Sequence, residues 1–105
     1  MLSRGRAVWY NLPGRTANGE TFDPEGFTAG HRTLPFGTKV RVVNDENGRS
    51  VMVRINDRGP KQTKFEIDLS RGSAKFLGIS GTAAVSLYAI EEEVSSTGSI
   101  VQSAK

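Results

Sequence analysis

The chain has 105 residues, enough for one small domain with one core and too few for two. Its 14 basic and 11 acidic side chains give a formal net charge of +3. They are scattered and form no basic stripe, so nucleic acid is not an expected partner. The sequence has no cysteine and no apolar run long enough to span a bilayer, which excludes disulfides and thiolate chemistry and predicts no membrane contact by this domain.

Short strands dominate the expected secondary structure, because apolar and polar residues alternate between clusters of Gly, Pro and Asn. We expect strands at residues 6–10, 39–43, 50–55, 65–69 and 84–90. The pair Asn47-Gly48 between two of them predicts a hairpin. Residues 15–35 have little periodicity and predict an ordered loop with a helical turn at 24–29. A helix is expected at 70–77, with Asp68 or Ser70 as its N-cap and Gly78 at its end.

Five or six short strands with one or two short helices favour an all-β fold, and a small closed barrel in particular, because closure removes exposed sheet edges. We expect one domain at residues 1–92. Residues 93–105 contain little that could be buried and predict a flexible C-terminal tail.

The chain has one histidine, His31, in the Gly-flanked loop Gly30-His31-Arg32-Thr33. A functional role is favoured over a packed core position, because histidine exchanges protons near neutral pH and loops often carry sites. Metal binding is disfavoured, since a single histidine without cysteine leaves only carboxylates to complete a coordination shell. We therefore expect neither a metal nor a cofactor.

Three acidic residues stand in unusual settings: Glu20 after Ala-Asn-Gly, Asp57 before Arg-Gly-Pro, and Asp68 where a strand meets a helix. Each also has a structural interpretation. Glu20 could complete a turn, Asp57 could pair with a neighbouring arginine, and Asp68 could cap the helix. Their combination with a loop histidine in one small domain favours chemistry.

Five segments closely resemble the barrel domain of the rare lipoprotein A family. They are GRTANGE (14–20), HRTLPFGT (31–38), NGRS (47–50), INDRGP (55–60) and IDLS (67–70), in the family's order and spacing. The resemblance covers roughly residues 5–90. It implies a six-stranded double-psi β-barrel, related to expansins, barwin-like domains and some endoglucanases. The chain departs from the family at Val8 and Asn11, where a serine and a glycine are common.

The resemblance also implies an activity. Characterised members are endolytic lytic transglycosylases that cut the β-1,4 bond after N-acetylmuramic acid in peptide-free glycan strands and leave 1,6-anhydro ends. By the same resemblance, Asp57 matches the essential aspartate and is the first choice for the acid/base. His31 matches the essential histidine, and Glu20 matches a third polar position. Asp68 matches the aspartate that expansins and related endoglucanases place before their helix, so the acid could be Asp57 or Asp68.

Two further functions remain open, because a fold does not fix a function. One is an expansin-like module that binds polysaccharide without cutting it, and the other is a protein-interaction role, for instance at the division site. The family's members act in the bacterial cell envelope, in the periplasm or anchored by lipid to the outer membrane. We therefore expect peptidoglycan strands as the partner, a monomer, and an envelope location. The export signal, lipidated cysteine and peptidoglycan-binding module of the family do not occur in this sequence.

Overall fold

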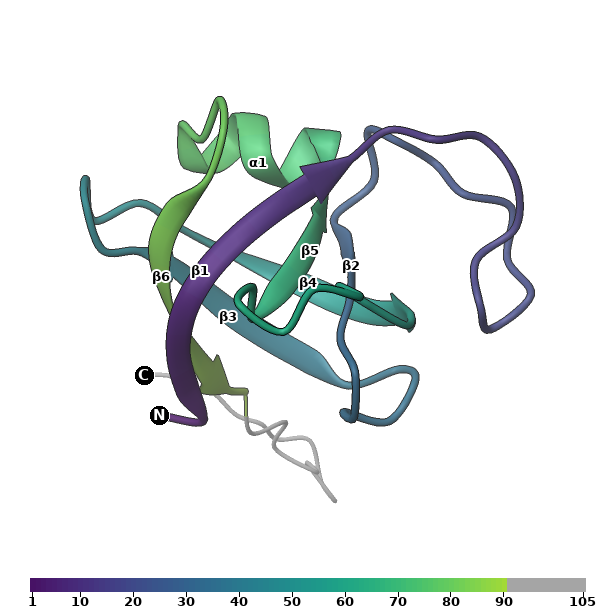
Figure 1. Cartoon of the computed structure of the whole chain (residues 1–105), viewed down its shortest axis with the longest axis horizontal. Coiled ribbons are helices and arrows are strands. Elements are labelled where there is room, and N and C mark those ends of the chain that lie inside the picture. The colour runs from purple at the N-terminus through teal and green to yellow at the C-terminus, as the bar shows by residue number, and fades with distance from the viewer. Residues whose placement is uncertain (91–105) are drawn as a thin grey trace, which may run out of the picture.

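Six strands close into a barrel, and one short helix packs across one side of it (Figure 1). The structure is a computed structural model that describes residues 1–90. The strands follow the order β1-β5-β2-β4-β3-β6 around the barrel. In chain order the elements are β1 (Ser3–Tyr10), β2 (Thr28–Gly30), β3 (Lys39–Asn44), β4 (Ser50–Asp57), β5 (Ile67–Ser70), α1 (Arg71–Leu77) and β6 (Ala83–Ala89).

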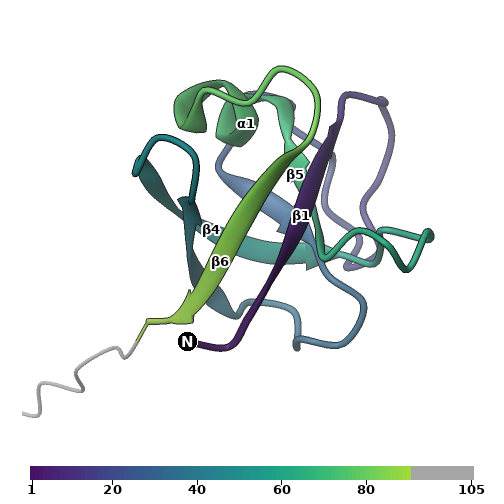
Figure 2. The ribbon, with the colours of Figure 1, turned by 60° about the vertical axis from the view of Figure 1, so that its left-hand side comes forward.

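One part of the barrel is a regular antiparallel sheet of β3, β4 and β6. The β3–β4 hairpin aligns Val42 with Val51, and β3 also aligns Val42 with Leu87 of β6. These side chains are buried because the alternation in each strand turns every second residue to the interior. β6 also pairs antiparallel with β1, and the two strands lie side by side in Figure 2. The apolar core of the domain is formed by side chains from all six strands and from α1.

The rest of the barrel contains parallel pairs, β1 with β5 and β2 with β4. β2 lies between β4 and β5, and it is antiparallel to β5. The central residue of this arrangement is Gly30, which is aligned with Asp57 on one side and with Asp68 on the other. The topology thus brings two aspartates from different strands to opposite sides of one glycine.

The helix α1 is fixed at both ends by local contacts. Ser70 is its N-cap, with Oγ accepting the Ser73 N–H at 3.1 Å, and Gly78 ends it with φ +76°. The cap is therefore Ser70, and Asp68 is left free for another role. A Cβ at Gly72 would lie 2.6 Å from the backbone oxygen of Glu25, so this position needs glycine for the loop to reach the helix.

The all-β barrel and the five expected strands are confirmed, with ends that differ by at most three residues. The helical turn expected at residues 24–29 is wrong, since a turn is followed there by the short strand β2. Residues 1–90 contain one helix, and it is neither long enough nor apolar enough to cross a membrane. The tail predicted at residues 93–105 lies outside the described residues.

Candidate active site

Asp57 and Asp68 face one another across Gly30. The three residues stand on the adjacent strands β4, β2 and β5. Strands are about 4.8 Å apart in a sheet, so the two aspartate backbones are separated by roughly 10 Å. The missing side chain of Gly30 leaves the space between them open, and a Cβ there would lie 3.5 Å from the Cβ of Asp57. The charge of Asp57 acts on Asp68 through this space.

The carboxylate of Asp57 is held by three hydrogen bonds. Oδ2 accepts the hydroxyl of Tyr10 at 3.0 Å, and Oδ1 accepts the backbone N–H groups of Ala17 and Arg58, each at 2.9 Å. The Asp57 carboxylate is therefore held in a fixed position at the end of β4.

Asp68 has the opposite surroundings. Its Oδ1 is buried and has no hydrogen-bond partner among residues 1–90. Burial, and secondarily the charge of Asp57, raise the pKa of Asp68 from 3.8 to about 6. Two carboxyl groups thus stand together, of which one is held by three donors and the other is partly buried with a raised pKa.

The pair opens into a surface hollow of about 320 Å³. The hollow is lined by Tyr10, Leu12, Pro13, Gly14, Arg15, Phe22, Asp57 and Asp68. The Tyr10 ring stacks on Phe22, with centroids 4.6 Å apart and the planes inclined by 16°. Burial, and then the two aspartates, raise the pKa of the Tyr10 hydroxyl, so it stays protonated and donates to Asp57. The site therefore combines two carboxyl groups with an aromatic wall and one cation.

Glu20 lies beside the pair and does not join it. Arg54 donates to both carboxylate oxygens of Glu20, with Nη2–Oε1 at 3.0 Å. Asn18 and Asn56 donate to the same carboxylate at 2.7 Å and 3.1 Å. These hydrogen bonds, led by that of Arg54, lower the pKa of Glu20 to about 2. Glu20 thus stays ionised and joins the loop of residues 14–22 to β4. The Ala17 N–H that reaches Asp57 belongs to this loop.

The structure places the imidazole of His31 away from both aspartates. Its Nδ1 accepts the backbone N–H groups of Thr33 and Leu34, each at 3.1 Å, and its Nε2 lies 3.8 Å from Oε2 of Glu66. The backbone of His31, in contrast, does contact the site, since its N–H donates to the Asp57 carbonyl at 3.1 Å. His31 is therefore joined to the site by its main chain.

A second hollow of about 350 Å³ lies elsewhere on the barrel and lacks this chemistry. Its lining contains no acidic side chain and consists of Leu2, Leu34, Gly37, Thr38, Lys39, Ala89 and Ile90. Within residues 1–90, no three His, Cys, Asp or Glu side chains come together in a way that could hold a metal ion. The hollow beside Asp57 and Asp68, in contrast, joins two acidic side chains to an aromatic wall.

Of the four residues expected at the site, the structure brings the side chains of Asp57 and Asp68 together, and the side chains of Glu20 and His31 have other partners. Sequence reasoning missed Tyr10 as a partner of Asp57. The two are 47 positions apart and meet because the strand order β1-β5-β2-β4 brings the ends of β1 and β4 near one another. The only signal was the position of Tyr10 at the end of an aromatic strand.

Comparisons with known proteins agree with this geometry. Residues 2–90 match the double-psi β-barrel family described as "Lytic transglycolase". The chain is 54% identical over 96 residues to a protein of Synechocystis sp. named "Probable endolytic peptidoglycan transglycosylase RlpA", with 86% of this chain and 30% of that protein covered. It is 50% identical over 92 residues to "Endolytic peptidoglycan transglycosylase RlpA" of Pseudomonas aeruginosa, with 83% and 27% covered. The chain thus spans less than a third of the length of either relative.

A solved structure supports the fold independently. The expansin of Clavibacter michiganensis superposes with a TM-score of 0.67 at 20% identity, and the match covers 87% of this chain and 51% of the expansin. An identity this low shows a shared barrel and leaves the chemistry open. The match over residues 2–90 is decisive for the family. The chain belongs to the lytic transglycolase family of double-psi β-barrel domains, within which it is an RlpA-like member.

Proposed function

We propose that this domain is an endolytic peptidoglycan transglycosylase, which cuts the β-1,4 bond between N-acetylmuramic acid and N-acetylglucosamine in peptide-free glycan strands. The observation that carries the proposal is the unequal pair of carboxyl groups, Asp57 and Asp68, at an open hollow. The family match and the names of the two relatives support the same reaction.

The reaction needs one group that first gives a proton and then takes one back. In our proposal Asp68 protonates the glycosidic oxygen, the C1–O4 bond breaks, and the N-acetylglucosamine end leaves as an alcohol. The 6-hydroxyl oxygen of the muramic acid residue then bonds to C1, and its proton passes to the Asp68 carboxylate. The product is a 1,6-anhydro end, no water is consumed, and Asp68 returns to its starting state.

Asp57 has the complementary role. Positive charge develops on the sugar ring as the bond breaks, and a fixed carboxylate nearby stabilises it. The three donors to Asp57 hold its carboxylate in place beside Asp68. Glu20 supports this arrangement from the side, because it holds the loop that carries the Ala17 N–H.

The main alternative is an expansin-like module that binds polysaccharide without cutting it. The family match over residues 2–90 and the names of the two relatives favour catalysis over binding alone. We also propose that the domain acts as a monomer on glycan strands of the bacterial cell envelope, in the periplasm or anchored by lipid to the outer membrane.

The first test is product analysis. The domain and its Asp57→Asn and Asp68→Asn variants are incubated with amidase-treated glycan strands across a pH series, and 1,6-anhydro products are measured by mass spectrometry. We expect Asp68→Asn to lower the rate by about 10²–10⁴ at every pH, as removal of an acid/base group does. We expect Asp57→Asn to retain a low rate with an optimum at more acidic pH, because the neighbouring charge that raises the pKa of Asp68 is gone.

Asp45→Asn is the matched control. Asp45 lies in the β3–β4 hairpin, accepts the Ser86 hydroxyl at 2.9 Å, and is not part of the site. Loss of all activity in Asp57→Asn with retention in Asp68→Asn would assign the proton to Asp57. Binding of glycan without any product from the parent domain would identify a non-catalytic module.

A further inference from the structure

The side chain of His31 folds the turn that follows it. Backbone N–H groups can only donate, so the two that point at Nδ1, from Thr33 and Leu34, require an unprotonated nitrogen there. The neutral ring therefore carries its proton on Nε2. Burial is the main cause that lowers the pKa of His31, in accordance with the neutral form. The imidazole is thus a double acceptor that shapes residues 31–34.

This turn holds Arg58. Nη1 of Arg58 donates to the carbonyl oxygens of His31 at 3.0 Å and Leu34 at 2.7 Å, the two ends of the turn. The guanidinium also lies over the ring of Phe36, 4.0 Å from its centroid. The backbone N–H of the same arginine donates to Oδ1 of Asp57. A continuous series of contacts therefore runs from the imidazole to the catalytic carboxylate of the proposed reaction.

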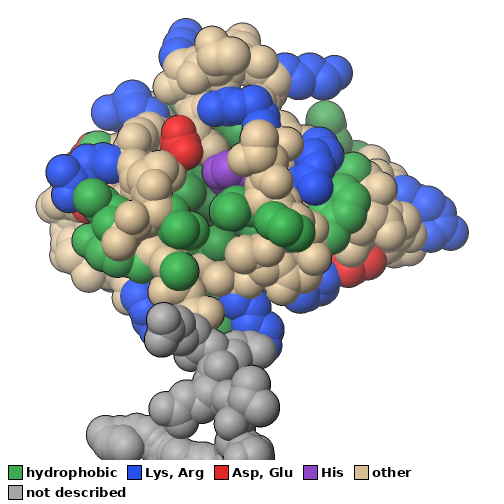
Figure 3. Space-filling view, turned by 90° about the horizontal axis from the view of Figure 1, so that it is seen from below, with side chains coloured by type: hydrophobic (Ala, Val, Ile, Leu, Met, Phe, Trp, Pro, Cys, Tyr) green, Lys and Arg blue, Asp and Glu red, His purple; other side chains and the backbone are tan. Residues whose placement is uncertain are grey.

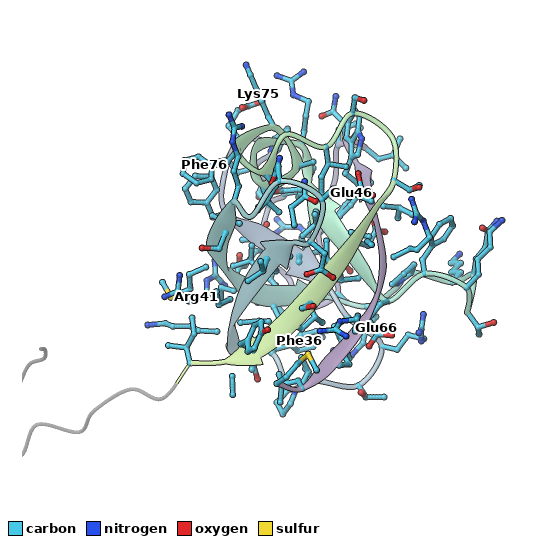
Figure 4. The ribbon with its side chains drawn as sticks, turned by 90° about the vertical axis from the view of Figure 1, so that its left-hand side faces the viewer. Phe36, Arg41, Glu46, Glu66, Lys75 and Phe76 are labelled. Atoms are coloured by element: carbon cyan, nitrogen blue, oxygen red, sulfur yellow. The ribbon has the colours of Figure 1, made fainter. Side chains whose placement is uncertain are left out.

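Neither ring nitrogen is available for the reaction itself. Nδ1 is occupied by the turn, and Nε2 faces Glu66, whose Oε2 also accepts the hydroxyl of Ser3 at 2.8 Å. Figure 3 shows the histidine at the face seen from below, bordered by hydrophobic side chains and one acidic group. Figure 4 shows Glu66 and Phe36 at this end of the barrel, with Lys75 and Phe76 at the other.

We propose that His31 is a positioning residue: its Nδ1 folds the turn of residues 31–34, the turn fixes Arg58, and Arg58 keeps its N–H on Asp57. The consequence for the reaction rests on the proposed function, whereas the structural part does not. The role requires a hydrogen-bond acceptor at the place of Nδ1. It requires neither a titratable group nor an imidazole.

Two amide substitutions separate these possibilities. The Oδ1 of an asparagine lies where Nδ1 lies in histidine, whereas the amide of a glutamine reaches the place of Nε2. His31→Asn therefore keeps the acceptor for the turn, and His31→Gln loses it. Both variants remove proton transfer, so a catalytic imidazole would be lost in both. Circular dichroism and thermal unfolding establish that each variant is folded.

The expected result is a large difference between the two variants. His31→Asn retains most of the parent kcat on peptide-free glycan strands, and His31→Gln loses about 100-fold in kcat with little change in KM, because the charge-stabilising carboxylate of Asp57 is misplaced. Amide hydrogen exchange gives a readout that needs no activity. The N–H groups of Thr33, Leu34 and Arg58 stay protected in His31→Asn and exchange faster in His31→Gln.

Two outcomes of the activity assay overturn the proposal. Loss of activity in both folded variants would make the imidazole itself catalytic, and full activity in both would make the acceptor irrelevant. If the parent domain makes no anhydro product, the proposed function fails, and hydrogen exchange alone decides the structural part. If either variant is unfolded, ¹⁵N NMR of the parent decides, since a proton on Nδ1 of the neutral ring contradicts the turn.

Discussion

The barrel consists of two regions that are built in different ways. The wall, formed by β3, β4 up to Ile55, and β6, is an antiparallel sheet with alternating apolar side chains and a local hairpin. The site region, formed by the end of β1, β2, β5 and the loop of residues 11–27, is held by polar contacts between residues far apart in the sequence. Asp57 alone joins Tyr10 and Ala17, which are 47 and 40 positions away.

This difference separates stability from activity. Burial of apolar surface in the wall supplies most of the favourable free energy of folding. The site region offsets part of this free energy, because Asp68 has a buried oxygen without a hydrogen-bond partner among residues 1–90. We therefore expect substitutions in the wall to change unfolding and substitutions in the site region to change turnover. Three experiments test this separation.

The largest effect is expected in the wall. Leu87 is fully buried in β6, and Leu87→Ala removes core contacts and leaves a cavity. It should lower the free energy of unfolding by about 2–5 kcal/mol in urea titrations. Met52→Ala, at a position that is 44% exposed on the same wall, is the control and should change it by less than about 0.5 kcal/mol. Under conditions where Leu87→Ala is folded, a tenfold loss of kcat would contradict the separation.

The second experiment compares two ion pairs. Glu20 is bound by Arg54 in the site region, and Glu25 is bound by Arg71 on the surface beside α1. Glu20→Gln should lower kcat by about 10- to 100-fold, because the loop that carries the Ala17 N–H loosens. Glu25→Gln should leave kcat unchanged. Equal losses of kcat in the two variants would show that Glu20 has no special connection to Asp57.

Both substitutions should cost less than about 1 kcal/mol in stability, because both carboxylates are partly exposed. The pH dependence of the free energy of unfolding also follows for Glu20. Its folded pKa of about 2 lies below the ordinary value of 4.5, so its contribution to stability is present above pH 4.5 and is lost as the pH falls toward 2. Acid titrations of the parent and of Glu20→Gln, followed by circular dichroism, measure this difference.

The smallest effect is expected for the stability of Asp68→Asn. The folded pKa of Asp68, about 6, lies above the unfolded value of 3.8, so its contribution is fully present below pH 3.8 and is lost as the pH rises through 6. At pH 8 the asparagine variant should be more stable than the parent by about 1 kcal/mol, after allowance for the exposed part of the group. At pH 3.5 the advantage should vanish. A pH-independent difference would contradict the raised pKa.

The same contrast explains what could be predicted from the sequence. Strands β3, β4 and β6 follow from local alternation, and the ends of α1 follow from Ser70 and Gly78. β2 was missed because its three residues, Thr28–Gly30, are too few to show a period. The direction of the His31 ring and the partnership of Tyr10 with Asp57 depend on strand order around the barrel. No local pattern reports that order.

The place of Gly30 between the two aspartates has a consequence for how such domains diversify. The spacing of the carboxyl groups is set by backbone hydrogen bonds across β4, β2 and β5. It does not depend on the side chains that line the hollow, such as Leu12 and Arg15. Substitution at those positions can therefore change which polymer is held while the spacing of the two carboxyl groups is kept. A barrel of this kind can acquire a new substrate before it alters its chemistry.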